Sequence, residues 1–319
     1  MSSLEADPSV GSERDPEPAA TEWLEGAPVA LGGPRGLAVT RTLPSKQRRT
    51  VGAWCFLDAY GPHDLTGSPG MRVGPHPHIG LQTVSWLMSG EVLHRDSLGS
   101  KREIRPGQLN LMTAGRGISH SEETPAEHTP VLQGVQLWVA LPDADRDVAP
   151  AFDTHADLPV VTEPGLSATV LLGTLAGATS PAKAYTPLVG AEITLAAGSD
   201  AHLPLRTDFE YAVLALDGTS TVDGVTVQPG PLLYLGAGRK SLRLAAGAAA
   251  RVLLLGGEPF EERLVMWWNF VARDHDEIVQ AREEWESGSG FGTVHGYAGA
   301  RIPAPPMPIT RLLPRSRVR

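Results

Sequence analysis

Four residues in two short pairs have the types and the spacing that metal chemistry needs. His76 and His78 lie in GPHPHIG, and His120 and Glu122 lie in GISHSEE. In both pairs the two residues are separated by one position, and on an extended strand such residues point to the same face. Each pair can therefore direct both side chains into one cavity. Three imidazoles and a carboxylate in one cavity form a candidate site for a divalent transition metal.

The ligand types favour iron(II) for this site. Three histidines and one carboxylate would close a tetrahedral zinc, whereas six-coordinate iron would keep two open positions. Open positions are what an oxygenase needs to hold a substrate and O₂ together. Manganese, nickel, cobalt, copper and zinc also accept these ligands, so the residues alone leave the native metal open.

Other polar residues are given simpler interpretations. Gln82 is a poor ligand as a neutral amide, and we expect it to support the site by hydrogen bonding. His94 is followed by Arg95-Asp96; a position in a pocket is the alternative, and exposure on the surface of a strand is the favoured interpretation. Cys55 lies in the apolar run VGAWCFLDAY, where a buried, unreactive thiol is the simplest interpretation.

The segments around the two pairs are short predicted strands separated by turn residues. The turns include Ser97–Ser100 and Arg105-Pro106-Gly107, and Gly (35) and Pro (28) are abundant in the chain. This spacing is typical of a β-barrel or sandwich. The predicted strands of this region are 81–87, 91–96, 109–112, 118–122 and 131–141.

A second part of the chain repeats this pattern without the ligands. PGQLNLMTAGRGISHSE (106–122) aligns with PGPLLYLGAGRKSLRLA (229–245), and VSWLMSG (84–90) aligns with AVLALDG (212–218). The repeat predicts two similar β domains, of which only the first binds metal. The residues that these alignments place opposite His76, His78, His120 and Glu122 are Pro204, Arg206, Arg243 and Ala245.

The sequence pattern changes in the C-terminal part of the chain, after the repeat. Residues 264–271 form an apolar, strand-like run, and Asp274 followed by Glu277 resembles a capping box that begins a helix. We therefore predict an all-β protein of two barrels with a short C-terminal helix. The predicted divisions are an acidic, disordered tail (1–25), a metal-binding domain (26–145), a ligand-free domain with the helix (146–290) and a Pro-rich basic tail (291–319).

Composition narrows the classes of partner. The 319-residue chain carries a net charge of −9, which argues against nucleic acid or an anionic membrane as the main partner. No apolar run approaches the ~20 residues that a membrane span needs. A single cysteine and the absence of a secretory leader pattern favour a reducing compartment, so we expect a cytoplasmic protein, and a monomer.

The strings PHPHIGLQTVSWLMSGEVLHRDSLGS and PGQLNLMTAGRGISHSE resemble the pirin family, a two-domain branch of the cupin superfamily. The resemblance covers about residues 35–290. It implies two cupin-type β-barrels, with a metal, usually iron, in the first. It places the metal ligands at His76, His78, His120 and Glu122. Gln82 stands where many cupins have a glutamate, and Gly115 stands where proline is usual.

The resemblance also implies two classes of function. Family members include quercetin 2,3-dioxygenases, and a eukaryotic member is a nuclear transcription cofactor. The first hypothesis is an iron-dependent dioxygenase that cleaves a flavonol-type aromatic enol with O₂, with Glu122 as the catalytic base. The alternative is a non-enzymatic, redox-sensing metal protein that modulates a protein partner.

Overall fold

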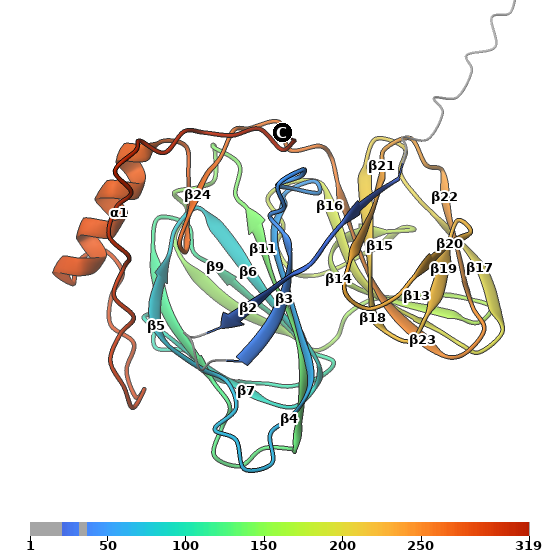
Figure 1. The fold of residues 1–319 in the computed structure, drawn as a ribbon, viewed down its shortest axis with the longest axis horizontal. Helices are drawn as coiled ribbons and strands as arrows, with labels where there is room; N and C mark the ends of the chain where they lie inside the picture. The colour runs from blue at the N-terminus through green and yellow to red at the C-terminus, as the bar shows by residue number, and fades with distance from the viewer. Residues whose placement is uncertain (1–20, 32–36, 319) are drawn as a thin grey trace, which may run out of the picture.

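The computed structural model describes residues 21–31 and 37–318, and they form two similar β-barrels side by side (Figure 1). Each barrel pairs a large antiparallel sheet with a four-stranded sheet. One helix is present in the described part of the chain, close to its C-terminal end. The predicted all-β fold of two barrels with a short C-terminal helix is confirmed.

The first barrel consists of two antiparallel sheets. The four-stranded sheet contains both predicted ligand pairs, in the order β5 (Arg72–His78), β10 (Ile118–Glu123), β7 (Val92–Asp96) and β8 (Lys101–Ile104). The seven-stranded sheet has the order β12 (Ala151–His155), β9 (Leu109–Thr113), β6 (Leu81–Ser89), β11 (Val131–Ala140), β4 (Trp54–Asp64), β3 (Leu37–Leu43) and β2 (Ala27–Leu31).

The second barrel repeats this arrangement strand for strand. Its small sheet has the order β17 (Ser199–Pro204), β22 (Ser241–Ala246), β19 (Ser220–Val222) and β20 (Val225–Val227). Its large sheet has the order β1 (Glu22–Leu24), β21 (Leu232–Gly236), β18 (Glu210–Asp217), β23 (Ala250–Gly257), β16 (Leu188–Leu195), β14 (Leu166–Leu175) and β13 (Val160–Glu163), with the short β15 (Ala178–Thr179) paired to β14. The identical order of pairing supports the internal duplication.

Two edge strands pair across the predicted domain boundaries. β1 lies at the start of the described chain, yet it pairs with β21 in the second barrel. β12 follows residue 145, yet it pairs with β9 in the first barrel. Residues 22–24 are therefore ordered rather than part of the predicted tail, and the boundary placed at 145/146 is too early. Residues 1–20 of that tail lie outside the described part of the chain.

The repeat also has a different register from the one that the sequence alignment gives. Arg243, aligned with His120, is exposed and forms an ion pair with Asp200, whereas Leu242 and Leu244 face the barrel core. A one-residue slip moves every side chain of a strand to the other face. In the second barrel, the positions equivalent to the ligand pairs therefore belong to an apolar core that includes Ala201 and Leu203. They are not Pro204, Arg206, Arg243 and Ala245. The conclusion that the second barrel lacks the ligands is unchanged.

The two large sheets pack against each other through their outer faces. Val84 and Leu137 of the first barrel share a buried cluster with Leu214 and Leu253 of the second. The buried Trp54 indole donates to the carbonyl oxygens of Val189 (3.0 Å) and Gly256 (3.2 Å). The barrels therefore form one continuous hydrophobic core across their interface.

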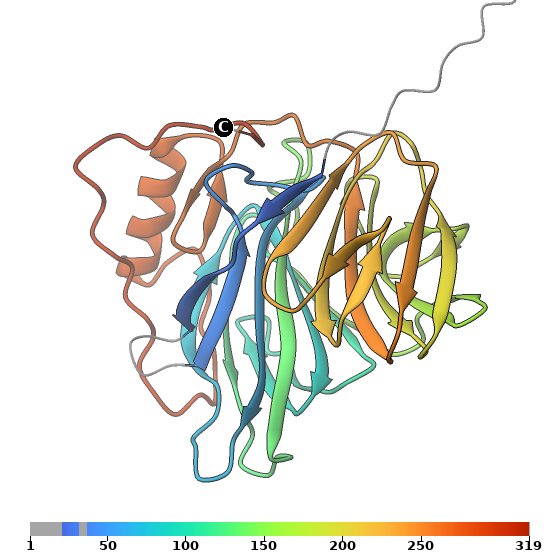
Figure 2. The same ribbon diagram turned by 45° about the vertical axis from the view of Figure 1, so that its right-hand side comes forward.

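The C-terminal segment returns to the first barrel, as both views show (Figures 1 and 2). The apolar run 264–271 is a hairpin, β24 (Val265–Trp267) and β25 (Phe270–Ala272), rather than one strand, because Trp268 turns the chain at φ 53°. Helix α1 (His275–Ser287) follows, with Asp274 accepting hydrogen bonds at its N-terminus as the capping pattern predicts. It packs on β24 and β25 beside β5, so this helix covers the first barrel and not the second.

Residues 291–302, which follow the helix, run over the sheet that carries the ligands. The amide of Ile302 donates to the carbonyl oxygen of Pro75, and the hydroxyl of Ser119 donates to the carbonyl oxygen of Phe291. The outer face of β5 and β10 is therefore covered by the C-terminal part of the chain. Among the described residues, no helix is long and apolar enough to cross a membrane.

Candidate metal centre

Two neighbouring antiparallel strands carry the predicted ligands. In the register of β5 and β10, His120 lies directly opposite His76, and His78 lies opposite Ile118. A bulge separates His120 from Glu122, so Glu122 lies opposite Val73 rather than at the next regular position. Bulges re-aim side chains and are frequent beside functional sites.

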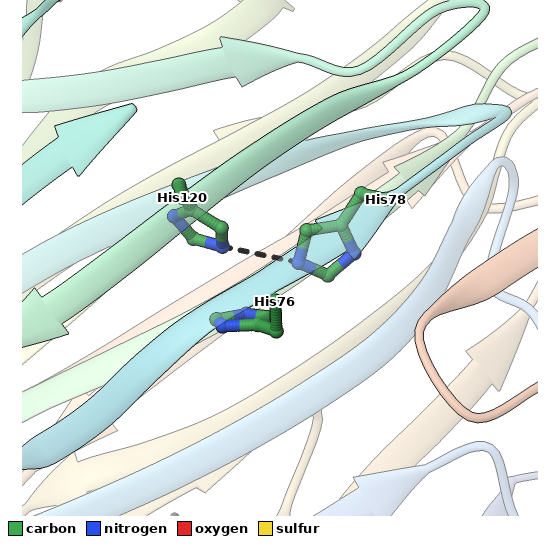
Figure 3. A group of neighbouring side chains, drawn as sticks. All are labelled: His76, His78 and His120. Carbon is green, nitrogen blue, oxygen red and sulfur yellow. Dashed lines mark hydrogen bonds between the residues drawn. The ribbon is translucent and has the colours of Figure 1, made fainter. Parts of the chain in front are cut away.

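The three histidines converge inside the first barrel (Figure 3). Their ring centroids are 4.4 Å apart for His76 and His120, and 5.0 Å apart for the other two pairs. One nitrogen from each ring can be chosen so that all three lie within 4.8 Å of one another. All three side chains are buried, so a cation between them would be shielded from water.

The second ring nitrogens show which atoms are left for a metal. His76 Nδ1 lies 2.8 Å from the carbonyl oxygen of Gly74, and His78 Nδ1 lies 2.9 Å from that of Asn269. A carbonyl only accepts, so Nδ1 carries the proton in both rings. Their Nε2 atoms are then unprotonated, which is the form that binds a metal.

His78 Nε2 lies 3.1 Å from His120 Nε2. An unprotonated His78 Nε2 needs either a proton from His120 or a cation in this space. The set of donors fits a divalent metal of the class that prefers imidazole nitrogen.

Burial also keeps the rings in the neutral state. Desolvation lowers the pKa of His76 to about 4. The same cause, with the neighbouring imidazoles adding to it, holds the pKa of His78 and of His120 well below the ordinary value for histidine. At neutral pH the three rings are therefore uncharged and ready to bind a metal without first losing a proton.

Glu122 lies next to this group in a second, overlapping one. Its carboxylate oxygen and one nitrogen each from His94 and His120 lie within 4.8 Å of one another. Desolvation raises its pKa, opposed by His94 and by hydrogen bonds with Ser85 and Gln136. The three-histidine group does not include Glu122 at this distance, so the four-residue ligand set remains a prediction.

Two sequence-based interpretations are wrong at this site. His94 is 2% exposed rather than on the surface, and its Nδ1 lies 3.4 Å from His120 Nδ1. Gln82 points to the opposite face of β6, where its amide donates to Thr113 Oγ1 and to the carbonyl oxygen of Lys183. The first error could have been avoided with the spacing rule used for the ligands, because His94 and Asp96 are also an i, i+2 pair on a strand.

Aromatic side chains pack against the histidines. Trp138 meets His78 edge to face at 5.1 Å, and Phe56 stacks on Trp138 at 4.0 Å. Phe152 of β12 stacks on His94 at 4.1 Å, with the two rings within 10° of parallel. These aromatic rings are apolar neighbours that help to exclude water from the histidines.

Comparisons with known proteins match both barrels. The Pirin family model matches residues 36–139, and the model of the Pirin C-terminal cupin domain matches residues 190–292. The chain is 49% identical over 279 residues to PA1205 of Pseudomonas aeruginosa, whose name carries quercetin 2,3-dioxygenase as a proposed activity. That match covers 87% of this chain and 88% of PA1205.

Solved structures agree with this match. A quercetin 2,3-dioxygenase from Acinetobacter baumannii superposes with a TM-score of 0.87 at 44% identity, covering 91% of this chain and 96% of that one. The Escherichia coli pirin YhhW, solved in complex with nickel(II), superposes at 0.59 with 18% identity, covering 76% of this chain and all of YhhW. At that identity the likeness shows the fold alone.

Proposed function

Because this chain belongs to the pirin family, we propose that it is a metal-dependent dioxygenase of the quercetin 2,3-dioxygenase type. The convergence of His76, His78 and His120 in a buried, aromatic-walled site is the observation that supports this most. The names of the similar proteins PA1205 and the A. baumannii enzyme point to the same activity. The substrate would be a flavonol-type aromatic enol, consumed with O₂.

The proposed ligands of the metal are His76, His78, His120 and Glu122, and the proposed metal is iron(II). When bound, the metal would supply the chemistry with O₂. The protein contributes neutral imidazoles in fixed positions that are buried from bulk water. The four-ligand set requires the Glu122 carboxylate to reach the space between the three imidazoles from β10, the strand that also carries His120.

Glu122 is the proposed base for the enol hydroxyl. Burial raises its pKa, which makes its carboxylate a stronger proton acceptor than an exposed glutamate. Ser85 and Gln136, which are hydrogen-bonded to each other (Ser85 Oγ to Gln136 Oε1, 2.9 Å), stabilise the ionised form of the carboxyl and so lower its pKa. Taking the hydroxyl proton leaves the substrate oxygen negatively charged and facing the metal position.

The test is turnover by metal-loaded protein. Apoprotein loaded anaerobically with iron(II), and separately with other divalent metals, is mixed with quercetin while quercetin absorbance and O₂ uptake are recorded. We expect equimolar loss of quercetin and O₂, abolished by His76→Ala and strongly reduced by Glu122→Gln. His202→Ala, at an exposed position on β17 of the ligand-free barrel, is the matched control and should retain activity.

Stoichiometric metal binding without quercetin or O₂ consumption, for every metal tried, would contradict the enzyme proposal. It would favour the alternative, a metal-binding regulatory protein.

A further inference from the structure

A series of buried polar groups leads to the three histidines, and two of its members, Asp96 and His94, have no part in the proposed function. It runs from Asp96 through His94 to His120, and each member is at most 2% exposed. His94 Nε2 lies 3.1 Å from Asp96 Oδ2, and His94 Nδ1 lies 3.4 Å from His120 Nδ1. Buried polar side chains arranged in series limit where their protons can be.

At the end of this series of polar groups that is farthest from His120, Asp96 is held by a turn. Asp96 Oδ1 accepts the backbone amides of Leu98 and Ser100, both at 2.9 Å. Its other oxygen is thus left facing His94. A carboxylate accepts and does not donate, so His94 Nε2 carries a proton toward Asp96. Phe152 stacks on the ring of His94 and holds it in this plane.

The position of the His94 proton determines which nitrogen of His120 is protonated. In the neutral form of His94, a proton on Nε2 leaves a lone pair at Nδ1. The nearest partner is His120 Nδ1, which must then be the donor. His120 Nε2 is left unprotonated, as are the Nε2 atoms of His76 and His78. The three lone pairs face one another, an arrangement that a cation stabilises.

We propose that His94 and Asp96 are positioning residues that fix His120 with its proton on Nδ1 and its Nε2 free for the metal. The inference rests on the metal site of the proposed function. It differs from the four-ligand set because His94 acts through His120 and does not touch the metal. Partners of this kind behind ligating histidines typically change metal affinity 10- to 100-fold.

The test compares His94→Phe with His94→Gln, using Co²⁺ as the probe. Phenylalanine keeps the stacking on Phe152 and removes both hydrogen bonds, whereas glutamine keeps one acceptor and one donor. We expect His94→Phe to bind Co²⁺ about 10- to 100-fold more weakly, with an altered visible absorption spectrum. His94→Gln should recover most of the affinity and the spectrum. Asp96→Asn should weaken binding in the same direction, and His202→Phe should leave both readouts unchanged.

The outcomes separate this inference from the proposed function. Wild-type affinity and spectrum in a folded His94→Phe would overturn the role of His94 while leaving the metal site intact. Two Co²⁺ ions per wild-type chain would also overturn it, because His94 would then be a ligand with Glu122. Failure of the wild-type protein to bind any divalent metal would overturn both proposals. Thermal unfolding of the metal-free variants shows whether an effect comes from loss of fold.

Discussion

Glu210 is predicted to be a main stabiliser of the contact between the barrels. This carboxylate is 1% exposed and lies in β18 of the second barrel. It accepts the Gly52 amide and the Tyr234 hydroxyl, both at 2.7 Å, and the Arg317 guanidinium at 2.8 Å. The Arg48 guanidinium lies 3.8 Å away. One side chain therefore joins both barrels to the C-terminal segment.

The expected magnitude follows from what Glu210→Ala would leave behind. Each buried polar group left without a partner costs about 1–3 kcal/mol. Here the Gly52 amide and the Tyr234 hydroxyl would lose their acceptor, whereas Arg48 keeps its ion pair with Glu22 at 3.2 Å. We expect Glu210→Ala to lower the free energy of unfolding by about 3–5 kcal/mol. Glu210→Gln should lower it by about 1–3 kcal/mol, since one amide oxygen still accepts.

Urea unfolding followed by tryptophan fluorescence and far-UV circular dichroism measures this difference. The matched control is Glu258→Ala, which removes an exposed ion pair with Arg206 and should cost at most about 1 kcal/mol. A loss for Glu210→Ala no larger than that of the control would refute the reasoning. So would equal losses for the alanine and glutamine variants: both lack the charge and only glutamine keeps an acceptor, so the hydrogen bonds to residue 210 would then contribute nothing.

Three further predictions concern the site and its surroundings. Burial lowers the pKa of His76 from 6.5 to about 4, so between these pH values His76 is protonated in the unfolded apoprotein and neutral in the folded one. The His76 contribution alone should therefore lower the apoprotein's free energy of unfolding by up to about 3 kcal/mol as the pH drops from 6.5 to 4, and His76→Ala should reduce the pH dependence of the urea midpoint. Gly80→Ala should destabilise the protein and weaken Co²⁺ binding, because a Cβ there would lie 2.0 Å from the carbonyl oxygen of Val271 at φ +69°. Gly99→Ala, also at positive φ but with open space around it, is the control, and equal effects on Co²⁺ binding would contradict the steric argument. Burial raises the pKa of Cys55 to about 12, so iodoacetamide at pH 8 should label it only after denaturation; labelling at an equal rate in the native protein would show that the thiol is accessible.

The sequence was sufficient for the features that depend on local spacing. The i, i+2 rule brought His76 and His78 to one face, and the turn residues predicted the strands of both barrels. The capping residues placed the start of the helix at Asp274. These features are local because strand alternation and helix capping involve neighbours in the chain.

Other features depended on distant residues. The pairing of β1 with β21 joins segments about two hundred residues apart, which no local pattern reports. The register of β22 was misjudged because its turn residues align well, whereas burial decides which face points inward. The charged neighbours Arg95 and Asp96 favour an exposed His94. In the structure, the backbone amide of Ser100 donates a hydrogen bond to Asp96, so this carboxylate can be buried without water.

The exchange of edge strands means that neither barrel can be inherited as an independent module. A cut between residues 145 and 146 would strip β12 from β9 and leave β21 without β1, exposing unpaired edges that invite aggregation. The hairpin that follows the second barrel also supplies the Asn269 carbonyl that orients His78. The second barrel lacks the ligands, yet the first barrel depends on it for a folded framework. It persists as part of the framework that shapes the other barrel's metal centre.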